Sequence, residues 1–309
     1  MYDWILKSKA YIKNTFKEQL PFDVCLANFA LPGGEVALFL KKKYNLPYIV
    51  LSHGHDIPWA FPKKMLLWHS LTYFKIKKIC SESSYNILLS KEIKQMADKL
   101  INNDKKNIVF YNGLYVDKIK NTLYDDKLKI IFVGRLTQQK NPMLFIEILY
   151  VLKQKNIPFE AKIFGDGELK HKMQEFVFLN NMENITFCGK VSHSEVLIAL
   201  DDANLLLSTS ESEGMALAIL EAIAAGVYVI ASNVSGNDNM IIENTNGHIV
   251  SKYHKDEFVL KIEDFYNNKL TKKYTYPENY TAILQDLFSW EKIAQDYLKL
   301  FNEIAPNPK

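Results

Sequence analysis

The sequence predicts an α/β protein with two domains, each a parallel sheet covered by helices. Short apolar runs alternate with longer amphipathic stretches along the 309 residues, which is typical of parallel strands joined by right-handed helical crossovers. Several runs, such as KIIFVG and VYVIAS, have no polar face, as expected for strands buried on both sides. A chain of this length with 48% hydrophobic residues can bury two cores.

The strands are expected, in chain order, at Asp23–Asn28, Tyr48–Ser52, Lys78–Ser81, Ile108–Tyr111, Lys129–Val133, Glu160–Phe164, Asn184–Cys188, Asn204–Ser208 and Val227–Ala231. Helices are expected in the amphipathic stretches between them, at Gly34–Lys43, Ser84–Leu100, Pro142–Lys155 and Ser192–Leu200. A further helix is expected from near Gly214 to Ala225, because Gly226 is typical of a helix end. Leu217, Leu220 and Ala224 would form its core-facing side.

A boundary between the domains is expected near residues 117–128, which are polar and precede a new strand. Residues 1–120 hold 19 Lys against 10 acidic residues, a charge of +9. Residues 121–309 hold 18 Lys and Arg135 against 25 acidic residues, a charge of −6. This division indicates domains with different partners, with ordinary surface variation as the alternative. The net charge of +3 gives no reason to expect nucleic acid as a partner.

Composition and motifs exclude several classes of protein. Cys25, Cys80 and Cys188 are far apart and form no CxxC pair, which indicates a reducing compartment and no structural zinc. The N-terminus lacks the apolar core of a signal peptide, and the most apolar window, Met215–Ala231, falls short of a membrane span. A cytoplasmic protein is therefore expected. No GxGxxG follows a strand and no GxxxxGK[ST] is present, which disfavours dinucleotide oxidoreductases and excludes P-loop chemistry.

Ligands of open α/β sheets bind beyond the carboxyl ends of the strands, so the residues there are the candidates for a site. Gly134, Arg135 and Lys140 follow one expected strand, and Asn141-Pro142 then opens a helix. A guanidinium and an ammonium at a helix N-terminus suit a diphosphate, whereas the alternative is a pair of solvated charges. Arg135 is the single arginine of the chain, which favours the functional interpretation.

Two further loops follow strands of the same domain. Gly165 follows the next expected strand, where it either admits a ligand close to the backbone or only forms the turn. Glu213 lies at or before the start of the helix expected near Gly214, and Glu221 lies two turns on. If both were helical, they would lie about 12 Å apart along its axis. Two such carboxylates suit the hydroxyl groups of one extended ligand, while the helix amides between them suit a phosphate or sugar oxygen. The alternative is a capping Glu213 and a solvent-facing Glu221.

Taken together, these segments resemble the retaining GT-B glycosyltransferases of family 4. The C-terminal half carries GRLTQQK, IFGDGEL, FCGKVSHSEVLIALDDANLLLSTS and EGMALAILEAIAAGVYVIAS in the family's order, with Glu213 and Glu221 as its E-x7-E pair. The N-terminal half carries the looser matches FDVCLANFALPGG, PYIVLSHGHD and YNGLYVDKI. The resemblance implies two Rossmann-like αβα domains facing a cleft: an acceptor-side domain at 1–120 and a donor-binding domain at 121–285. Residues 286–309, with FSWEKIAQDYLKLF, resemble the terminal helix that returns to the first domain.

The resemblance also implies a role for each candidate residue. Arg135 and Lys140 would hold the donor diphosphate as its bond to the sugar breaks. Glu213 would face the transferred sugar or its phosphate, and Glu221 would bind the ribose. His53, with His55 as the alternative, would reach the sugar and complete a catalytic set with Arg135, Lys140 and Glu213. The other implied donor-binding positions are Gly134, Gly165, Lys190, Val191, Gly214, Met215, Ala216 and Leu217, of which Lys190 and Val191 would read the base through the main chain.

The implied reaction moves a sugar, with retention, from a UDP-sugar or GDP-sugar to a glycan or lipid-linked acceptor in bacterial capsule or lipopolysaccharide synthesis. No cofactor or metal is expected, because Arg135 and Lys140 neutralise the leaving group and no DxD clamp lies beside them. Asp125-Asp126 and Asp201-Asp202 are interpreted as solvated turn residues. One alternative is a non-catalytic or split subunit that binds nucleotide sugar but needs a partner chain. Another is a GT-B nucleotide-sugar epimerase, which the E-x7-E pair disfavours.

The sequence departs from the family pattern in two ways. Ala216, Ala218 and Tyr228 stand where the family usually has Gly, Pro and Pro, and the methyl group of Ala216 would alter donor choice. The family's opening strands, with their glycine-rich loop, have no counterpart, so an incomplete first domain is expected. A truncation, a second chain that supplies the missing part, or a donor site without one wall would each account for this.

The segments Met1–Lys17 and Pro62–Lys78 combine lysines with aromatic residues. An anionic membrane would suit a surface of Lys63, Lys64, Lys75, Lys77 and Lys78 with Met65, Leu67, Trp68, Leu71 and Phe74. Peripheral contact with the inner face of the cell membrane is therefore one interpretation. The other is a set of core-facing helices with their lysines in solvent.

Overall fold

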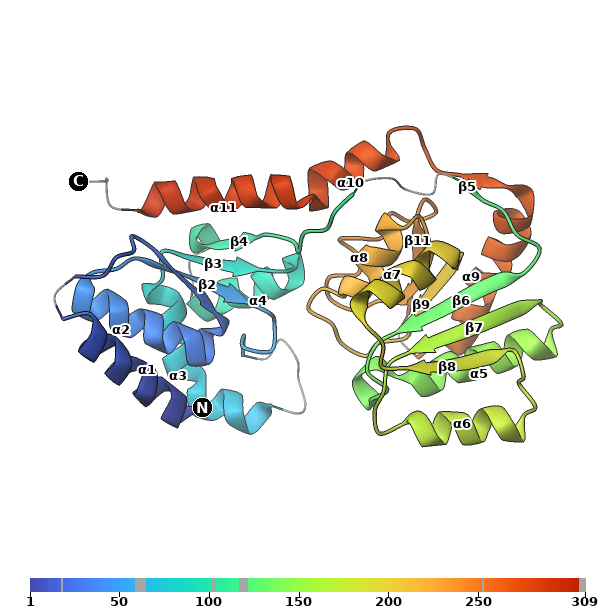
Figure 1. The fold of residues 1–309 in the computed structure, drawn as a ribbon, viewed down its shortest axis with the longest axis horizontal. Coiled ribbons are helices and arrows are strands. Elements are labelled where there is room, and N and C mark those ends of the chain that lie inside the picture. The colour runs from blue at the N-terminus through green and yellow to red at the C-terminus, as the bar shows by residue number, and fades with distance from the viewer. Residues whose placement is uncertain (18, 59–64, 102–103, 117–121, 252, 306–309) are drawn as a thin grey trace. The chain divides into compact units, whose positions relative to one another are not determined.

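The computed structural model describes the chain except residues 18, 59–64, 102–103, 117–121, 252 and 306–309 (Figure 1). The chain divides into two compact units, Met1–Gly113 with Trp290–Lys309, and Leu114–Ser289. The sequence placed these divisions after residues 120 and 285. Within the described residues, no helix is both long and apolar enough to span a bilayer.

The first unit contains a parallel sheet of four strands in the order β1 (Cys25–Asn28), β2 (Tyr48–Ser52), β3 (Tyr85–Leu88) and β4 (Asn107–Val109). Its helices are α1 (Tyr2–Thr15), α2 (Gly34–Tyr44), α3 (Leu66–Glu82), α4 (Lys91–Ile101) and α11 (Trp290–Ile304). Short helical turns, η1 (Phe29–Gly33) and η2 (Asp104–Lys106), follow β1 and precede β4.

Successive residues of a strand point to opposite faces of the sheet, and both faces of this sheet are covered by helices. On one face, Tyr48 and Val50 of β2 pack in a core with residues of α2 and α3. On the other face, Ile49 of β2 and Ile87 of β3 pack against Leu300 of α11. The C-terminal helix therefore supplies the second layer of the first unit.

The expectation of a strand at Lys78–Ser81 is wrong, because these residues belong to α3. Ile76, Ile79 and Cys80 are all buried against the sheet, and this spacing follows the helical period. The next strand of the sheet is instead β3, Tyr85–Leu88. These residues were expected to form the first part of a helix at Ser84–Leu100. The backbone N–H of Ser84 donates to the carbonyl of Tyr48 on β2, which aligns the chain for β3.

The second unit has a parallel sheet of six strands: β6 (Leu128–Val133), β7 (Phe159–Phe164), β8 (Ile185–Gly189), β9 (Leu205–Ser208), β10 (Tyr228–Ser232) and β11 (Gly247–Val250). Its spatial order, β11-β10-β9-β6-β7-β8, is that of a doubly wound nucleotide-binding fold. The sequence predicted the first five of these strands to within a residue or two but not β11. A two-stranded antiparallel pair joins β5 (Thr122–Leu123) to β12 (Tyr274–Thr275).

Helices cover both faces of the six-stranded sheet (Figure 1). One layer contains α5 (Pro142–Gln154), α6 (Lys170–Leu179) and α9 (Lys255–Asn268), and the other contains α7 (His193–Asp202) and α8 (Leu217–Ala224). The turns η3 (Gln138–Lys140) and η4 (Leu270–Lys272) and the helix α10 (Tyr280–Phe288) complete the unit.

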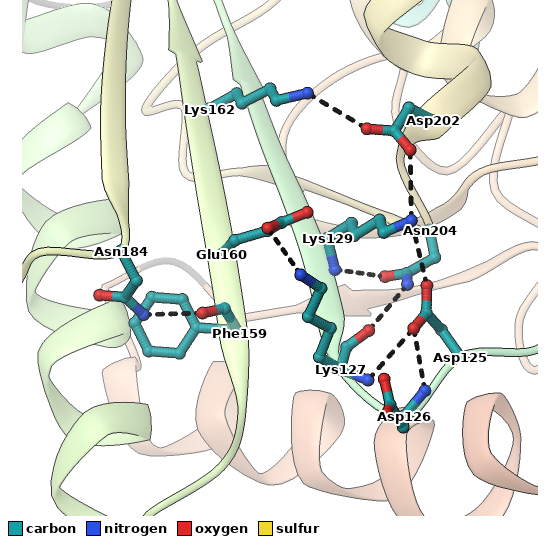
Figure 2. A network of polar contacts seen from close by, with 10 residues as sticks. All are labelled: Asp125, Asp126, Lys127, Lys129, Phe159, Glu160, Lys162, Asn184, Asp202 and Asn204. Atoms are coloured by element: carbon teal, nitrogen blue, oxygen red, sulfur yellow. Dashed lines mark hydrogen bonds and ion pairs between the residues drawn. The ribbon is translucent and has the colours of Figure 1, made fainter.

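A polar network joins Lys129 of β6 and Lys162 of β7 to the end of α7 (Figure 2). Asp202 accepts hydrogen bonds from Lys162 at 3.1 Å and from Lys129 at 3.2 Å. These two contacts lower the pKa of Asp202 from its ordinary value. Asp202 is exposed, as expected, but it ends a helix and pairs with two strands rather than forming a turn. Asp125 does form a turn, accepting from the backbone of Asp126 and Lys127.

Candidate functional site

The candidate site lies where the strand order of the second unit reverses, at the carboxyl ends of β6 and β9. These strands are neighbours in the sheet, although two strands separate them in sequence. Ligands of doubly wound folds bind in the crevice that such a reversal creates. The loop after β6 begins at Gly134 and the loop after β9 begins at Thr209.

Hydrogen bonds join the two loops. The backbone N–H of Glu211 donates to the carbonyl of Gln139 at 2.8 Å, and the Gln139 side chain donates to the carbonyl of Ser212 at 3.1 Å. The Thr209 hydroxyl donates to the carbonyls of Lys140 and Asn141. The loops thus form one surface whose shape is fixed by the backbone.

Lys140 and Glu213 meet on this surface. The ammonium Nζ of Lys140 lies 2.5 Å from Oε1 of Glu213, and the Ser210 hydroxyl donates to the same oxygen at 2.6 Å. Glu213 is only 8% exposed, so its charge requires such partners. The structure therefore brings together two of the sequence-predicted site residues and adds Ser210.

A small pocket opens beside this ion pair, between the ends of β6 and β9 and the start of α8. It is lined by Phe132, Val133, Lys140, Leu206, Leu207, Ser208, Ser210, Ala216, Ala218 and Ile219. Ala216 and Ala218 are two of the positions at which the sequence departs from the pattern that it resembles. Both alanines therefore line the same pocket as Lys140.

Arg135 lies on the same loop as Lys140 but has a different partner. It is exposed, and its Nη2 donates to Gln139 Oε1 at 3.4 Å. The single arginine of the chain is thus held only weakly, through the residue that also joins the two loops. Its predicted contact with a diphosphate stays a prediction.

Glycines bring the carboxyl ends of β6, β7 and β8 close together. A Cβ atom on Gly165 would lie 1.9 Å from the carbonyl oxygen of Gly134, and Gly165 has a φ of +138°. The N–H of Gly165 donates to the carbonyl of Gly189 at 2.8 Å. Backbone packing thus requires glycine at 165, whereas the predicted contacts of Gly134 and Gly165 with a donor stay predictions.

The helix that follows Glu213 begins later than expected. α8 starts at Leu217, with Ala216 as its extended N-cap residue, so Gly214 and Met215 lie in the loop. Leu217 is 51% exposed, and its expected place on the core-facing side is wrong. Because Glu213 precedes the helix, the spacing expected for two helical carboxylates does not apply. The amino end of α8 still directs its first amides toward this loop.

Glu221 has a partner that the sequence analysis missed. Nε2 of His193 lies 2.9 Å from Oε1 of Glu221, whose side chain is 21% exposed. His193 is the first residue of α7, and Ser192 before it forms a capping box with Glu195. Lys190 and Val191 immediately precede this cap. The contact joins α7 to α8. The one sequence signal that could have suggested it is that His193 follows closely after Lys190 and Val191, which were predicted to bind the donor.

His53 lies in the first unit, at the carboxyl end of β2. Its Nε2 lies 3.3 Å from Oδ1 of Asn28 at the end of β1, and its ring centroid lies 4.6 Å from that of Phe29. The buried carboxylate of Asp56 accepts from the backbone N–H of His53 and of Ala30. Two strand ends of the first unit are thereby tied together around His53.

His55, the alternative to His53, is exposed and accepts a hydrogen bond through its carbonyl from Nε2 of His69. His69 is fully buried, so this contact anchors the backbone after β2. Among the described residues, no group of three or more His, Cys, Asp and Glu side chains is arranged to hold a metal ion.

Comparisons with known proteins identify the family. The model of the family described as glycosyl transferases group 1 matches residues 116–282. The uncharacterized glycosyltransferase MJ1178 of Methanocaldococcus jannaschii is 31% identical over 306 residues, which cover 96% of this chain and 81% of that protein. The amylovoran biosynthesis glycosyltransferase AmsK of Erwinia amylovora is 27% identical over 227 residues, covering 70% of this chain and 51% of AmsK.

A solved structure agrees with the sequence comparisons. The crystal structure of Anabaena HepE in complex with UDP and glucose has a TM-score of 0.75 and 16% sequence identity, and the match covers 96% of this chain and 81% of HepE. This likeness shows the fold, an α/β fold with parallel sheets that matches GT-B glycosyltransferases. The family match covers more than half of the chain and includes the loops that hold Lys140 and Glu213. The chain therefore belongs to the glycosyl transferases group 1.

Proposed function

We propose that the chain transfers a sugar from a UDP-sugar or GDP-sugar to a glycan or lipid-linked acceptor in polysaccharide synthesis, with retention and without a metal ion. The contact between Lys140 and Glu213 at the strand-order reversal carries the proposal. UDP and glucose in the HepE complex support a nucleotide-sugar donor. The naming of AmsK for amylovoran biosynthesis supports an acceptor in glycan synthesis.

Charge movement explains why this pair suits the reaction. When the bond between the sugar and the diphosphate breaks, negative charge grows on the leaving nucleoside diphosphate. Lys140 is a mobile cation, and Arg135 on the same loop offers a planar fork of donors, so the two can neutralise that charge. The amino end of α8 adds partial positive charge beside them.

Donor binding then changes the partners of Glu213. Diphosphate oxygens compete with its carboxylate for the Lys140 ammonium, while the Ser210 hydroxyl keeps Glu213 in place. Glu213 becomes able to accept a hydrogen bond from a hydroxyl group of the transferred sugar. Glu221, held by His193, would take the ribose hydroxyls.

Thermal unfolding with UDP, GDP and ADP tests donor binding. A nucleotide that binds the native state raises the melting temperature, and we expect UDP or GDP to do so. Lys140→Ala should abolish the rise, whereas Lys172→Ala, which removes an exposed lysine of α6, should preserve it. No response to any of the three nucleotides would contradict the proposal.

Product analysis tests the reaction itself. Mass spectrometry of reactions with panels of nucleotide sugars and lipid-linked acceptors should reveal one transferred sugar. NMR of the product should show the anomeric configuration of the donor, and EDTA should leave the rate unchanged. Inversion would contradict retention, and loss of activity in EDTA would contradict metal independence.

A further inference from the structure

Helix α3 presents a row of large apolar side chains to solvent. Leu67, Leu71 and Phe74 are 75%, 78% and 82% exposed, and their spacing of four and three residues places them on one side of the helix. The opposite side, with Ile76 and Ile79, is buried against the sheet. Single exposed apolar residues are ordinary, but a continuous apolar patch marks a contact surface.

The start of α1 lies beside this row. Nζ of Lys75 on α3 lies 5.3 Å from the ring centroid of Tyr2, and Tyr2 is itself 59% exposed. We call the surface of Tyr2, Leu67, Leu71 and Phe74 the α3 face. Two helices from separate parts of the first unit thus contribute to one exposed apolar surface.

Lys75 and Lys78 lie beside the α3 face, on a unit that carries an excess of lysines. Helices α1, α2 and α3 together hold nine lysines and three acidic residues. Lys78, one turn after Phe74, is exposed and continues the apolar row with a cation. The first unit as a whole holds 20 Lys and 12 acidic residues, a charge of +8, whereas the second has a charge of −5.

We propose that the α3 face binds the surface of an anionic lipid bilayer, which goes beyond the proposed transferase activity. Apolar side chains in such a face enter the boundary between headgroups and acyl chains, while the surrounding lysines attract anionic headgroups. A second copy of the chain fits less well, because two faces with this excess of lysines repel each other. Of the residues first assigned to such a surface, Trp68 is instead partly buried, and Lys63 and Lys64 lie outside the described residues.

Vesicle sedimentation of the full chain tests this surface. With vesicles of phosphatidylcholine and phosphatidylglycerol in equal parts, the chain should sediment, and binding should fall as the salt concentration rises. With phosphatidylcholine alone it should stay in the supernatant. Phe74→Ser should weaken the partition onto the anionic vesicles by about tenfold, and Lys78→Glu should weaken it as well.

Phe178 provides a matched control. Its ring, on α6 of the second unit, is 80% exposed, so Phe178→Ser removes the same apolar group outside the α3 face and should leave the partition unchanged. Equal sedimentation with neutral and anionic vesicles, or equal losses in the two Phe→Ser variants, would overturn the proposal. The proposal would also be overturned if the full chain were a dimer, Phe74→Ser were a monomer and vesicle binding were unaltered, because the α3 face would then join two copies of the chain. An unchanged melting temperature and nucleotide response of Phe74→Ser would show that its fold and donor site are intact.

Discussion

Glu213 shows how the candidate site is built before any ligand binds. A carboxylate that is 8% exposed is costly unless it is paired, and Glu213 is held by Lys140 and by the Ser210 hydroxyl. Its neighbours on the backbone are fixed by the bonds between the two loops. The carboxylate is therefore positioned by the fold rather than by a substrate.

Breaking this ion pair should destabilise the second unit. Lys140→Met leaves Glu213 buried without its cation, and we expect a loss of about 2 kcal/mol in the free energy of unfolding. Lys140→Met with Glu213→Gln should recover most of that loss, because no unpaired charge remains. Urea denaturation measures both, and strictly additive losses would show that the two side chains do not interact.

His193 should affect donor affinity more than turnover. It is exposed and its contact with Glu221 lies near the surface, so His193→Ala should change the free energy of unfolding by less than about 1 kcal/mol. If Glu221 binds the ribose, the loss of its partner should raise KM for the nucleotide sugar several-fold with a smaller change in kcat. His171→Ala, which removes another exposed histidine of the second unit, is the control. If His193→Ala and His171→Ala changed kcat and KM to the same extent, this role of His193 would be rejected.

At the scale of elements, the glycines at the ends of β6, β7 and β8 determine how closely the strand-end loops pack. Gly165→Ala would place a methyl group 1.9 Å from the Gly134 carbonyl oxygen, so the loop after β7 would have to move away from the loop after β6. Gly189, with a φ of +72°, has no atom within 4 Å of such a Cβ, and there alanine adds only conformational strain of about 1 kcal/mol. Gly165→Ala should therefore lower the urea midpoint clearly more than Gly189→Ala, and it should also weaken the response to nucleotides. The opposite order would show that the loops tolerate separation.

The network at the other end of these strands should make stability depend on pH. Lys162 and Lys129 lower the pKa of Asp202, so the ionised form is favoured in the folded state and its contribution is present at neutral pH. That contribution is lost as the pH falls through the lowered pKa. Because Asp202 is half-exposed, Asp202→Asn should cost less than about 1 kcal/mol at neutral pH. Urea midpoints of the two proteins should converge in acid, and a constant difference would contradict the assignment.

The same elements show what the sequence could predict. Strands β6 and β9 were recognisable because each is a largely apolar run that ends in a polar or glycine-rich loop, and this also located Lys140 and Glu213. The run Lys78–Ser81 was mistaken for a strand because four residues cannot separate a strand from the buried side of a helix. His193 was missed because its contact with Glu221 depends on the packing of α7 against α8, which no local pattern encodes.

At the scale of the whole molecule, each unit has its own closed set of layers. The first unit needs α11 from the end of the chain, because Leu300 covers Ile49 and Ile87. A Cβ on Gly113 would lie 2.5 Å from the Trp290 ring, so the chain enters and leaves this unit in close contact. The first unit is therefore built from two segments of the chain, and the second unit is one continuous segment that lies between them in sequence.

The continuous unit should fold by itself. Its two ends are already joined, because the N–H of Leu114 donates to the carbonyl of Phe288 at 2.9 Å and Leu114 pairs with Ser289. The Gln285 side chain also donates to the carbonyl of Val116. Because a compact unit with its own core can fold alone and commonly has neighbouring termini, the fragment 114–289 should unfold cooperatively in urea and should keep the melting response to UDP or GDP.

The complementary truncation should behave differently. Removal of residues 290–309 from the full chain uncovers Ile49 and Ile87 and leaves the first unit with one helical layer. Buried apolar side chains of this size contribute about 1.5–3 kcal/mol each, so the first unit should unfold at lower urea than in the full chain while the second keeps its transition. Circular dichroism across a urea series distinguishes the two transitions. A fragment 114–289 that fails to fold, or a truncated chain that loses both transitions together, would show that the two units depend on each other for stability.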